Sequence, residues 1–84
     1  MTKQEAIELG RKDGEEDVLT VLVEQGIGIV RATLSPGHLG WDEGAINAGA
    51  AQFAGVPDEL RADYYEAYRV AARALAIRLT KEEI

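Results

Sequence analysis

The sequence contains no cysteine among its 84 residues. Disulfide bonds and thiolate metal ligands are therefore excluded, and the composition is consistent with a reducing compartment. Long apolar runs are lacking as well, because no stretch approaches the roughly 18 residues of a membrane-spanning helix. The first ten residues, MTKQEAIELG, do not have the pattern of a secretory signal. We expect a cytoplasmic protein without membrane association.

Histidine is nearly lacking, since His38 is the only one. A metal site would require His38 together with Asp42 or Glu43 and further ligands from elsewhere in the chain. Catalysis would require a nucleophile beside it, and the proline–glycine turn between Ser35 and His38 is not a triad signature. We therefore expect no enzymatic activity, no metal and no other cofactor.

Two stretches that resemble ligand-binding motifs are incomplete. The acids at 13–17 lack the alternating oxygen ligands and the distal glutamate of a calcium loop. GIG at 26–28 lacks the remaining glycine of a dinucleotide-binding loop and its flanking strand and helix. Neither stretch predicts a metal or nucleotide site.

Bases are scarce relative to acids. Nine lysines and arginines face fifteen aspartates and glutamates, which gives a net charge of −6. Residues 1–59 carry eleven acids and four bases, whereas residues 60–84 carry four acids and five bases. Nucleic-acid affinity is built from Lys and Arg contacts to phosphates, so direct nucleic-acid binding is disfavoured. An acidic surface favours basic proteins as partners instead.

Apolar residues recur with helical spacing from Pro57 to about Leu79, the longest helix signal in the chain. They follow one another at intervals of three or four, which places them on one helix face: Leu60, Tyr64, Tyr68, Ala71, Leu75 and Leu79. Six of the thirteen alanines lie in this stretch and add helix propensity. We expect this helix to be the scaffold, with Tyr64 and Tyr68 in the core and their hydroxyls reaching water.

The N-terminal segment predicts a first helix. Thr2 followed by Glu5 is a capping-box pattern at a helix start. We expect this helix to end near 12–14, where two bases precede a glycine. Gly10 and Gly14 are four apart, which either allows another helix to approach closely or marks fraying.

A second helix is predicted from the acids at 13–17, because acids directly before an apolar run suit a helix N-terminus. Gly26 would close this helix. The many β-branched residues of 18–33 leave open a β-hairpin that turns at 24–26. Helix is favoured because an isolated hairpin needs further strands that this chain does not offer.

The central segment predicts a turn and a third helix. Ser35-Pro36-Gly37 is typical of a type II turn. Asp42 has the position of an N-cap, with Trp41 before it and Ile46 four after it at the spacing of a hydrophobic staple.

The third helix, 43–54, is rich in glycine and alanine. Ile46, Ala50 and Phe53 would form its apolar stripe. Its small residues would pack closely on the alanines of the long helix, at Ala67, Ala71 and Ala74.

The chain as a whole predicts a single all-α domain over residues 1–84. We expect a compact bundle of four helices, near 2–13, 16–25, 43–54 and 57–80. A short helical or irregular segment, 27–34, should follow the second helix. The first three helices should pack around the last.

For function, the charge predicts a non-enzymatic interaction protein that binds a basic surface on another protein. The residues expected to carry this binding are seven acids and one tryptophan: Asp13, Glu15, Glu16, Asp17, Glu24, Asp42, Glu43 and Trp41. Such a face can imitate nucleic-acid phosphates, which would make the partner a nucleic-acid-binding protein and the role inhibitory. Phage inhibitors of host defence, including anti-CRISPR proteins, use this strategy; the analogy rests on size and charge alone. The alternative interpretation of 13–17 is a solvated helix start.

A second hypothesis is a structural or assembly module. It would self-associate, for example as a homodimer, through apolar surface near Trp41, Phe53 and Tyr65. Aromatic residues of this kind are enriched at interface hot spots. Trp41 has an alternative structural role as a staple between its own helix and the core.

Overall fold

The computed structural model describes residues 1–35, 37, 38 and 40–82, and within these ranges every regular element is a helix. The long helices are α1 (Lys3–Gln25) and α5 (Arg61–Glu82), and a short 3₁₀ turn, η1 (Asp58–Leu60), leads into α5. Between them lie α2 (Ile27–Ala32), α3 (Trp41–Asn47) and α4 (Ala50–Phe53). The prediction of an all-α fold is confirmed, and the alternative hairpin at 18–33 is wrong. The predicted turn at 35–37 includes Pro36, which lies outside the described residues.

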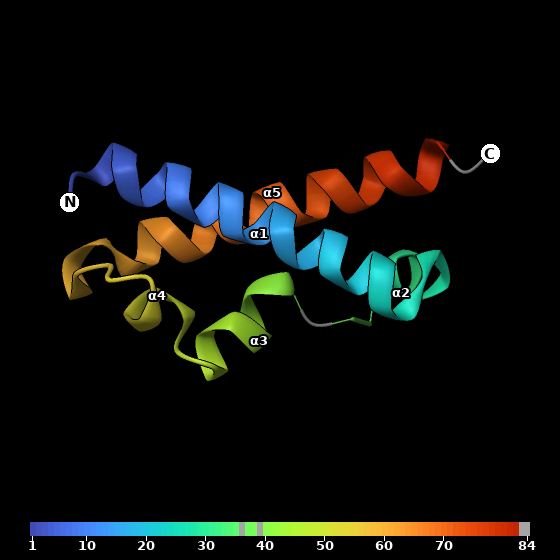
Figure 1. Cartoon of the computed structure of the whole chain (residues 1–84), viewed down its shortest axis with the longest axis horizontal. Helices are drawn as coiled ribbons and strands as arrows, with labels where there is room; N and C mark the ends of the chain where they lie inside the picture. Colours follow the sequence, from blue (N-terminus) through green and yellow to red (C-terminus); the bar gives the residue numbers. More distant parts are fainter. Residues whose placement is uncertain (36, 39, 83–84) are drawn as a thin grey trace.

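The two long helices form the axis of the molecule, which measures 40 × 23 × 21 Å. They run in the same direction and cross, while α3 and α4 lie below the pair in Figure 1 and α2 lies against their far end. The most extensive packing in the fold is between α1 and α5. The long C-terminal helix is thus a scaffold as predicted, but it shares that role with α1.

α1 is one continuous helix of 23 residues, so the predicted break between 2–13 and 16–25 is wrong. Gly10 and Gly14 are buried against α5 rather than frayed. A Cβ atom added at Gly10 would overlap the carbonyl group of Tyr64 and would lie only 3.0 Å from the carbonyl carbon. A Cβ atom added at Gly14 would lie 3.1 Å from the carbonyl carbon of Tyr68. Of the two interpretations of this glycine pair, close helix approach is the correct one.

The ends of α1 follow the local signals. The Thr2 Oγ1 accepts from the Glu5 backbone N–H at 3.1 Å, and the Thr2 N–H donates to Glu5 Oε1 at 2.8 Å. The hydrogen bond from the Thr2 N–H to the carboxylate is the first cause that holds the pKa of Glu5 below its ordinary value. Gly26, at φ +90°, ends the helix and donates its N–H to the Leu22 carbonyl. The capping box and the glycine stop are confirmed.

The predicted helix 43–54 is divided in two. Gly49 has φ +71°, a conformation that glycine adopts without steric cost, and it separates α3 from α4. α3 begins at Trp41 with Gly40 as its N-cap, so the predicted cap at Asp42 is wrong. Trp41 therefore lies inside the helix and not before its cap, so it does not occupy the predicted staple position, and Ile46 is 46% exposed.

The apolar stripe predicted for this segment is also wrong, because Phe53 is 90% exposed. The residue that α4 buries is Ala51, whose N–H donates to the Tyr65 hydroxyl at 3.1 Å and whose carbonyl accepts from the Val56 N–H at 2.9 Å. Two residues along a helix correspond to a rotation of about 200°, so Phe53 points away from the core.

The core consists of two clusters. One lies around the buried rings of Tyr64 and Tyr68 and includes Ala45 of α3 and Ala51 of α4. The other joins α1, α2 and α5 through Val18, Val30, Ala72, Leu75 and Ala76. Trp41 is half-buried and packs against both clusters.

The alanines expected to receive the third helix, Ala67, Ala71 and Ala74, lie instead on a face of α5 beside α1. α3 and α4 contact α5 through its tyrosines instead.

The close approach at Gly10 leads to a first prediction. Gly10→Ala should lower the free energy of unfolding by about 2 kcal/mol or more, because the added methyl meets rigid backbone. Gly44→Ala in α3 is the matched control, since nothing lies within 4 Å of its Cβ position. That variant should be neutral or more stable by up to about 1 kcal/mol. Urea denaturation measures both, and equal stability of the two variants would contradict the packing described.

Candidate functional site

Two tyrosine hydroxyls of α5 reach α1. The Tyr64 hydroxyl donates to Asp13 Oδ2 at 2.6 Å, and the Tyr68 hydroxyl donates to a carboxylate oxygen of Asp17. The expectation that these hydroxyls reach water is therefore wrong. The tyrosines are four residues apart, as are the aspartates, so one helical turn repeats the same contact.

A sequence signal for this contact exists within GRKDGEED at 10–17. Gly-x-x-Asp occurs twice in succession, and each glycine admits the backbone of the tyrosine whose hydroxyl binds the aspartate three residues later. On α5, Tyr64 and Tyr68 are separated by the same interval of four residues. Sequence reasoning treated the glycines and the acids separately and missed this pairing.

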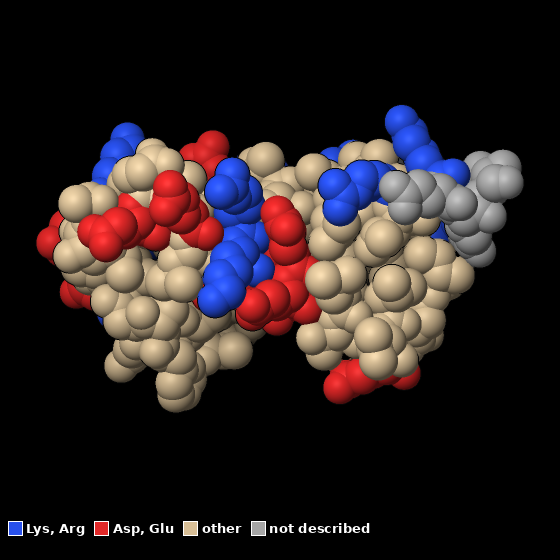
Figure 2. Space-filling model, turned by 45° about the horizontal axis from the view of Figure 1, so that its top comes forward, with Lys and Arg blue, Asp and Glu red and all other residues tan. Residues whose placement is uncertain are grey.

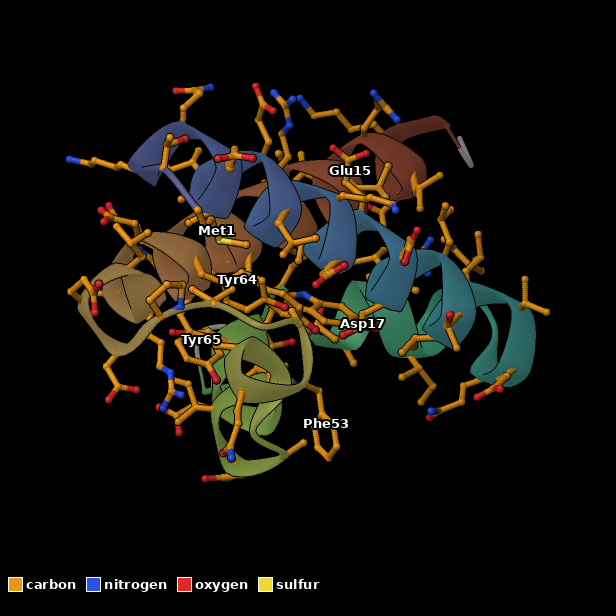
Figure 3. All side chains as sticks on the ribbon, turned by 60° about the vertical axis from the view of Figure 1, so that its left-hand side comes forward. Met1, Glu15, Asp17, Phe53, Tyr64 and Tyr65 are labelled. Atoms are coloured by element: carbon orange, nitrogen blue, oxygen red, sulfur yellow. The ribbon has the colours of Figure 1, made fainter. Side chains whose placement is uncertain are left out.

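The acid cluster at 13–17 is divided between the sides of α1. Asp17 lies toward the tyrosines and Phe53, whereas Glu15 lies on the opposite side of the helix (Figure 3). Glu16 is exposed and stands 4.0 Å from the Lys12 ammonium. The cluster is therefore not one patch.

Three of these acids line a hollow of about 400 Å³ between α1, α4 and α5, which we call the acidic hollow. Its lining combines three carboxylates with apolar and aromatic groups: Asp13, Glu16, Asp17, Leu9, Ala50, Phe53, Ala54, Tyr64 and Tyr68. Phe53 is 90% exposed, and its ring projects from α4 (Figure 3). The hollow thus combines negative charge with an accessible aromatic ring.

The carboxylates in the hollow repel one another. The pKa of Asp17 is raised above its ordinary value of 3.8, first because partial desolvation of this otherwise exposed residue disfavours its charged form and then because Asp13 and Glu16 are negative. Burial, followed by the hydrogen bond to Asp13, also raises the pKa of the Tyr64 hydroxyl. The ion pair of Glu16 with Lys12 is exposed and offsets little of this charge. A cation entering the hollow would relieve the repulsion.

The remaining predicted binding residues lie elsewhere. Glu24 is exposed in the last turn of α1, seven residues or about 10 Å beyond Asp17. Asp42 and Glu43 occupy the first turn of α3. The structure brings together Asp13, Glu16 and Asp17 but not all seven acids.

Trp41 is not a freely projecting anchor. It is half-buried, and its indole Nε1 is buried without a hydrogen-bond partner among the described residues. Its packing against both core clusters agrees with the structural alternative of anchoring α3, although not through the predicted staple.

Figure 2 shows one face of the molecule, on which basic side chains lie between groups of acidic ones. The net charge of −6 is thus not expressed there as one continuous acidic surface.

In the described part of the chain, no three His, Cys, Asp or Glu side chains are arranged to hold a metal ion. His38 lines a different hollow, with Trp41 and Glu43. No helix within residues 1–35, 37, 38 and 40–82 combines the length and apolarity needed to cross a membrane.

Comparisons with protein-family models, curated proteins and solved structures find no match to this chain. The site is therefore interpreted from its own chemistry. Carboxylates with spare acceptor capacity beside an exposed aromatic ring are suited to a cation that has an apolar stem.

The charge repulsion around Asp17 gives a second prediction. Because its pKa is raised in the folded state, protonation stabilises the protein below about pH 4, and this contribution is lost as pH rises through the folded pKa. Asp17→Asn retains an acceptor for Tyr68 but does not titrate. Its stability relative to the unmodified protein should therefore increase between about pH 3 and pH 7.

Thermal or urea unfolding across this pH range measures the effect. Glu24→Gln removes one charge from the same helix away from the hollow and is the control. A stability difference for Asp17→Asn that does not change with pH would contradict the electrostatic description.

Proposed function

We propose that the protein is a non-enzymatic interaction module whose acidic hollow binds a basic side chain on another protein. The observation that carries this proposal is the convergence of Asp13, Glu16 and Asp17 beside Phe53, which is 90% exposed. An exposed aromatic ring beside carboxylates can attract a cation that the carboxylates also neutralise.

The chemistry favours lysine or arginine as the inserted group. A guanidinium or ammonium neutralises the carboxylates, its methylene stem packs on the alanines and Leu9, and the face of Phe53 attracts a cation. The overall charge of −6 steers a basic partner toward the molecule.

The hollow is also preorganised. Asp13 and Asp17 are each held by a tyrosine hydroxyl from α5. A carboxylate has about four lone-pair positions, so each retains acceptors for a ligand after accepting one hydroxyl. Fixing these side chains before binding reduces the entropy that the complex must lose.

The narrower form of this proposal names the partner as a nucleic-acid-binding protein whose phosphate-binding surface meets the acids. The small size and the acidic charge of the protein support this partner, and the proposal also places the protein in the cytoplasm. Direct binding of nucleic acid is not proposed, because the acidic hollow would repel phosphates.

The third prediction uses two adjacent glutamates on different sides of α1. Lysine-rich and arginine-rich peptides should bind the protein, and affinity should fall about tenfold or more between 50 and 300 mM salt. Glu16→Lys should weaken binding by about tenfold, because it reverses a charge in the hollow. Glu15→Lys changes the net charge equally but lies outside the hollow, so its effect on a short peptide that occupies a single hollow should be smaller. Fluorescence anisotropy with labelled peptides measures all of these.

Equal effects of Glu15→Lys and Glu16→Lys would show that only the overall charge matters and would overturn the assignment to the hollow. The native partner can be sought by affinity capture from host extract at low and high salt. A partner whose capture is independent of both salt and Glu16→Lys would contradict the proposed function.

A second role, self-association through the apolar surface near Trp41, Phe53 and Tyr65, is favoured by one observation, the exposure of Phe53. Trp41 and Tyr65 are half-buried, and the Tyr65 hydroxyl already accepts from Ala51. This role therefore depends on Phe53.

The fourth prediction belongs to this role. If Phe53 mediates assembly, Phe53→Ser should shift the mass in sedimentation equilibrium toward the 9.1 kDa of one chain. The fold should be unaffected because the ring contributes little to the core. An unchanged association constant would exclude Phe53 as the contact.

A further inference from the structure

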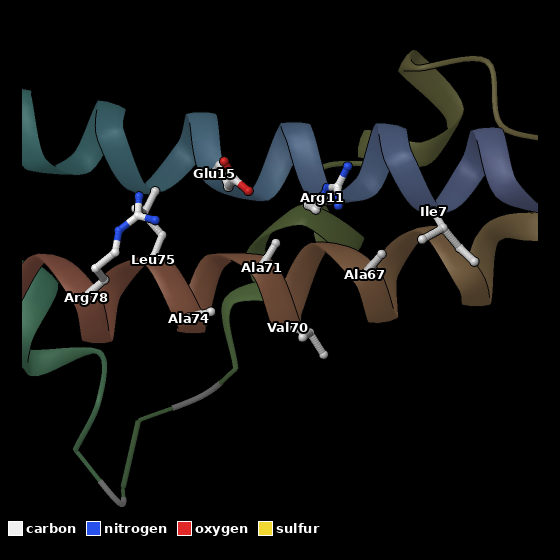
Figure 4. Close-up of a pocket in the computed structure, with 9 residues that line it drawn as sticks. All are labelled: Ile7, Arg11, Glu15, Ala67, Val70, Ala71, Ala74, Leu75 and Arg78. Carbon is white, nitrogen blue, oxygen red and sulfur yellow. The ribbon is translucent and has the colours of Figure 1, made fainter.

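One face of the α1–α5 pair carries no other helix of the described chain. α2, α3 and α4 lie to the other side of the pair in Figure 1. A groove of about 510 Å³ follows the bare face, and Figure 4 shows side chains from both long helices around it. We call it the α1–α5 groove.

The floor of this groove is apolar. Ile7 of α1 and Val70 and Leu75 of α5 line it together with the three alanines of α5 that were expected to receive the third helix. Val70 is 53% exposed, and the alanines leave room for another helix to approach closely.

The groove also carries charges of both signs. Arg11 and Glu15 project from α1, and the Arg78 side chain extends from α5 toward them (Figure 4). None of the three makes an ion pair within the described residues. The ion pairs that are described there join other side chains, Lys3 with Asp63, Lys12 with Glu16 and Arg61 with Asp58.

We propose that the α1–α5 groove binds the same groove of a second copy of this chain, related by a two-fold axis. In such an isologous contact each surface must complement itself. Glu15 and Arg78 lie on the same face at different positions along the groove, so a two-fold axis that passes between them brings each Glu15 to Arg78 of the other copy. A uniformly acidic or basic partner would leave one sign of charge without a counterpart.

The small size of the protein supports a second copy of the chain as the molecule that covers the groove. Its largest fully buried side chains are only Tyr64, Val18 and Val30, and a domain of this length has a small core of limited stabilising power. A standard interface covers about 800 Å² per partner, which is roughly 15% of this chain's 5358 Å² surface. Covering the groove would turn a two-helix layer into the centre of a four-helix bundle.

The dimer leaves the acidic hollow open, because Glu15 and the hollow lie on opposite sides of α1. Each dimer would then present two hollows and could bind two basic groups of one partner with higher avidity. The dimer itself does not depend on the proposed function. The binding of two basic groups by its two hollows does rest on that function.

Sedimentation equilibrium of the full chain tests the dimer. At about 100 µM the mass should be near 18 kDa, twice the 9.1 kDa of one chain. Val70→Asp should weaken association at least tenfold, because it places a charge in the apolar floor. Val23→Asp is the matched control, since Val23 is an exposed valine of α1, 84% accessible, that does not line the groove. Far-UV circular dichroism verifies that both variants remain helical.

A charge exchange tests the pairing directly. Glu15→Arg alone and Arg78→Glu alone should each be largely monomeric, since each places two like-charged pairs across the axis. An equimolar mixture of these two variants should form a heterodimer, because both pairs then join opposite charges. Mass restored by mixing supports the proposal, and a mixture that stays monomeric overturns the Glu15–Arg78 pairing.

Other results would overturn the dimer itself. These are a monomer at every concentration, equal weakening by Val70→Asp and Val23→Asp, or dissociation caused by Phe53→Ser but not by Val70→Asp. The last result would assign assembly to the Phe53 surface instead. Retained peptide binding by monomeric Val70→Asp would show that the hollow functions without the dimer.

Discussion

The close approach of α1 and α5 is the constraint on which the other features depend. At Gly10 and Gly14 there is no space for a side chain, because the carbonyl groups of Tyr64 and Tyr68 occupy it. Each glycine costs helix stability on its own account. The cost is offset because the backbones come close enough for the tyrosine hydroxyls to reach the aspartates on the neighbouring helix.

This contact also organises the acidic hollow. Asp13 and Asp17 face the tyrosines because they lie three residues after the glycines, on the same side of α1. Glu15 is turned to the opposite side of the helix, where it lines the α1–α5 groove. One short acidic sequence therefore contributes to two surfaces with different chemistry, the acidic hollow and the α1–α5 groove, which carries charges of both signs.

Several features were predictable because their causes are local. The Thr2–Glu5 capping box, the stop at Gly26 and the helical periodicity of 60–79 depend on neighbours within a few residues. The interpretation of Gly14 as a break failed because intrinsic propensity disfavours glycine in a helix, while a partner 54 residues away compensates for it. The single helix expected at 43–54 failed because the left-handed conformation of Gly49 divides it.

The sequence by itself determined the all-α class, the long C-terminal helix and the acidic balance, because periodicity, propensity and charge are properties of the residues in order. Only the tertiary structure decided which acids act together. Asp13 and Tyr64 are 51 residues apart, and no spacing within one helix brings them into contact. Exposure of Phe53 was likewise decided by the Tyr65–Ala51 hydrogen bond and the glycine before α4, since the direction of a side chain is set by how its helix is anchored.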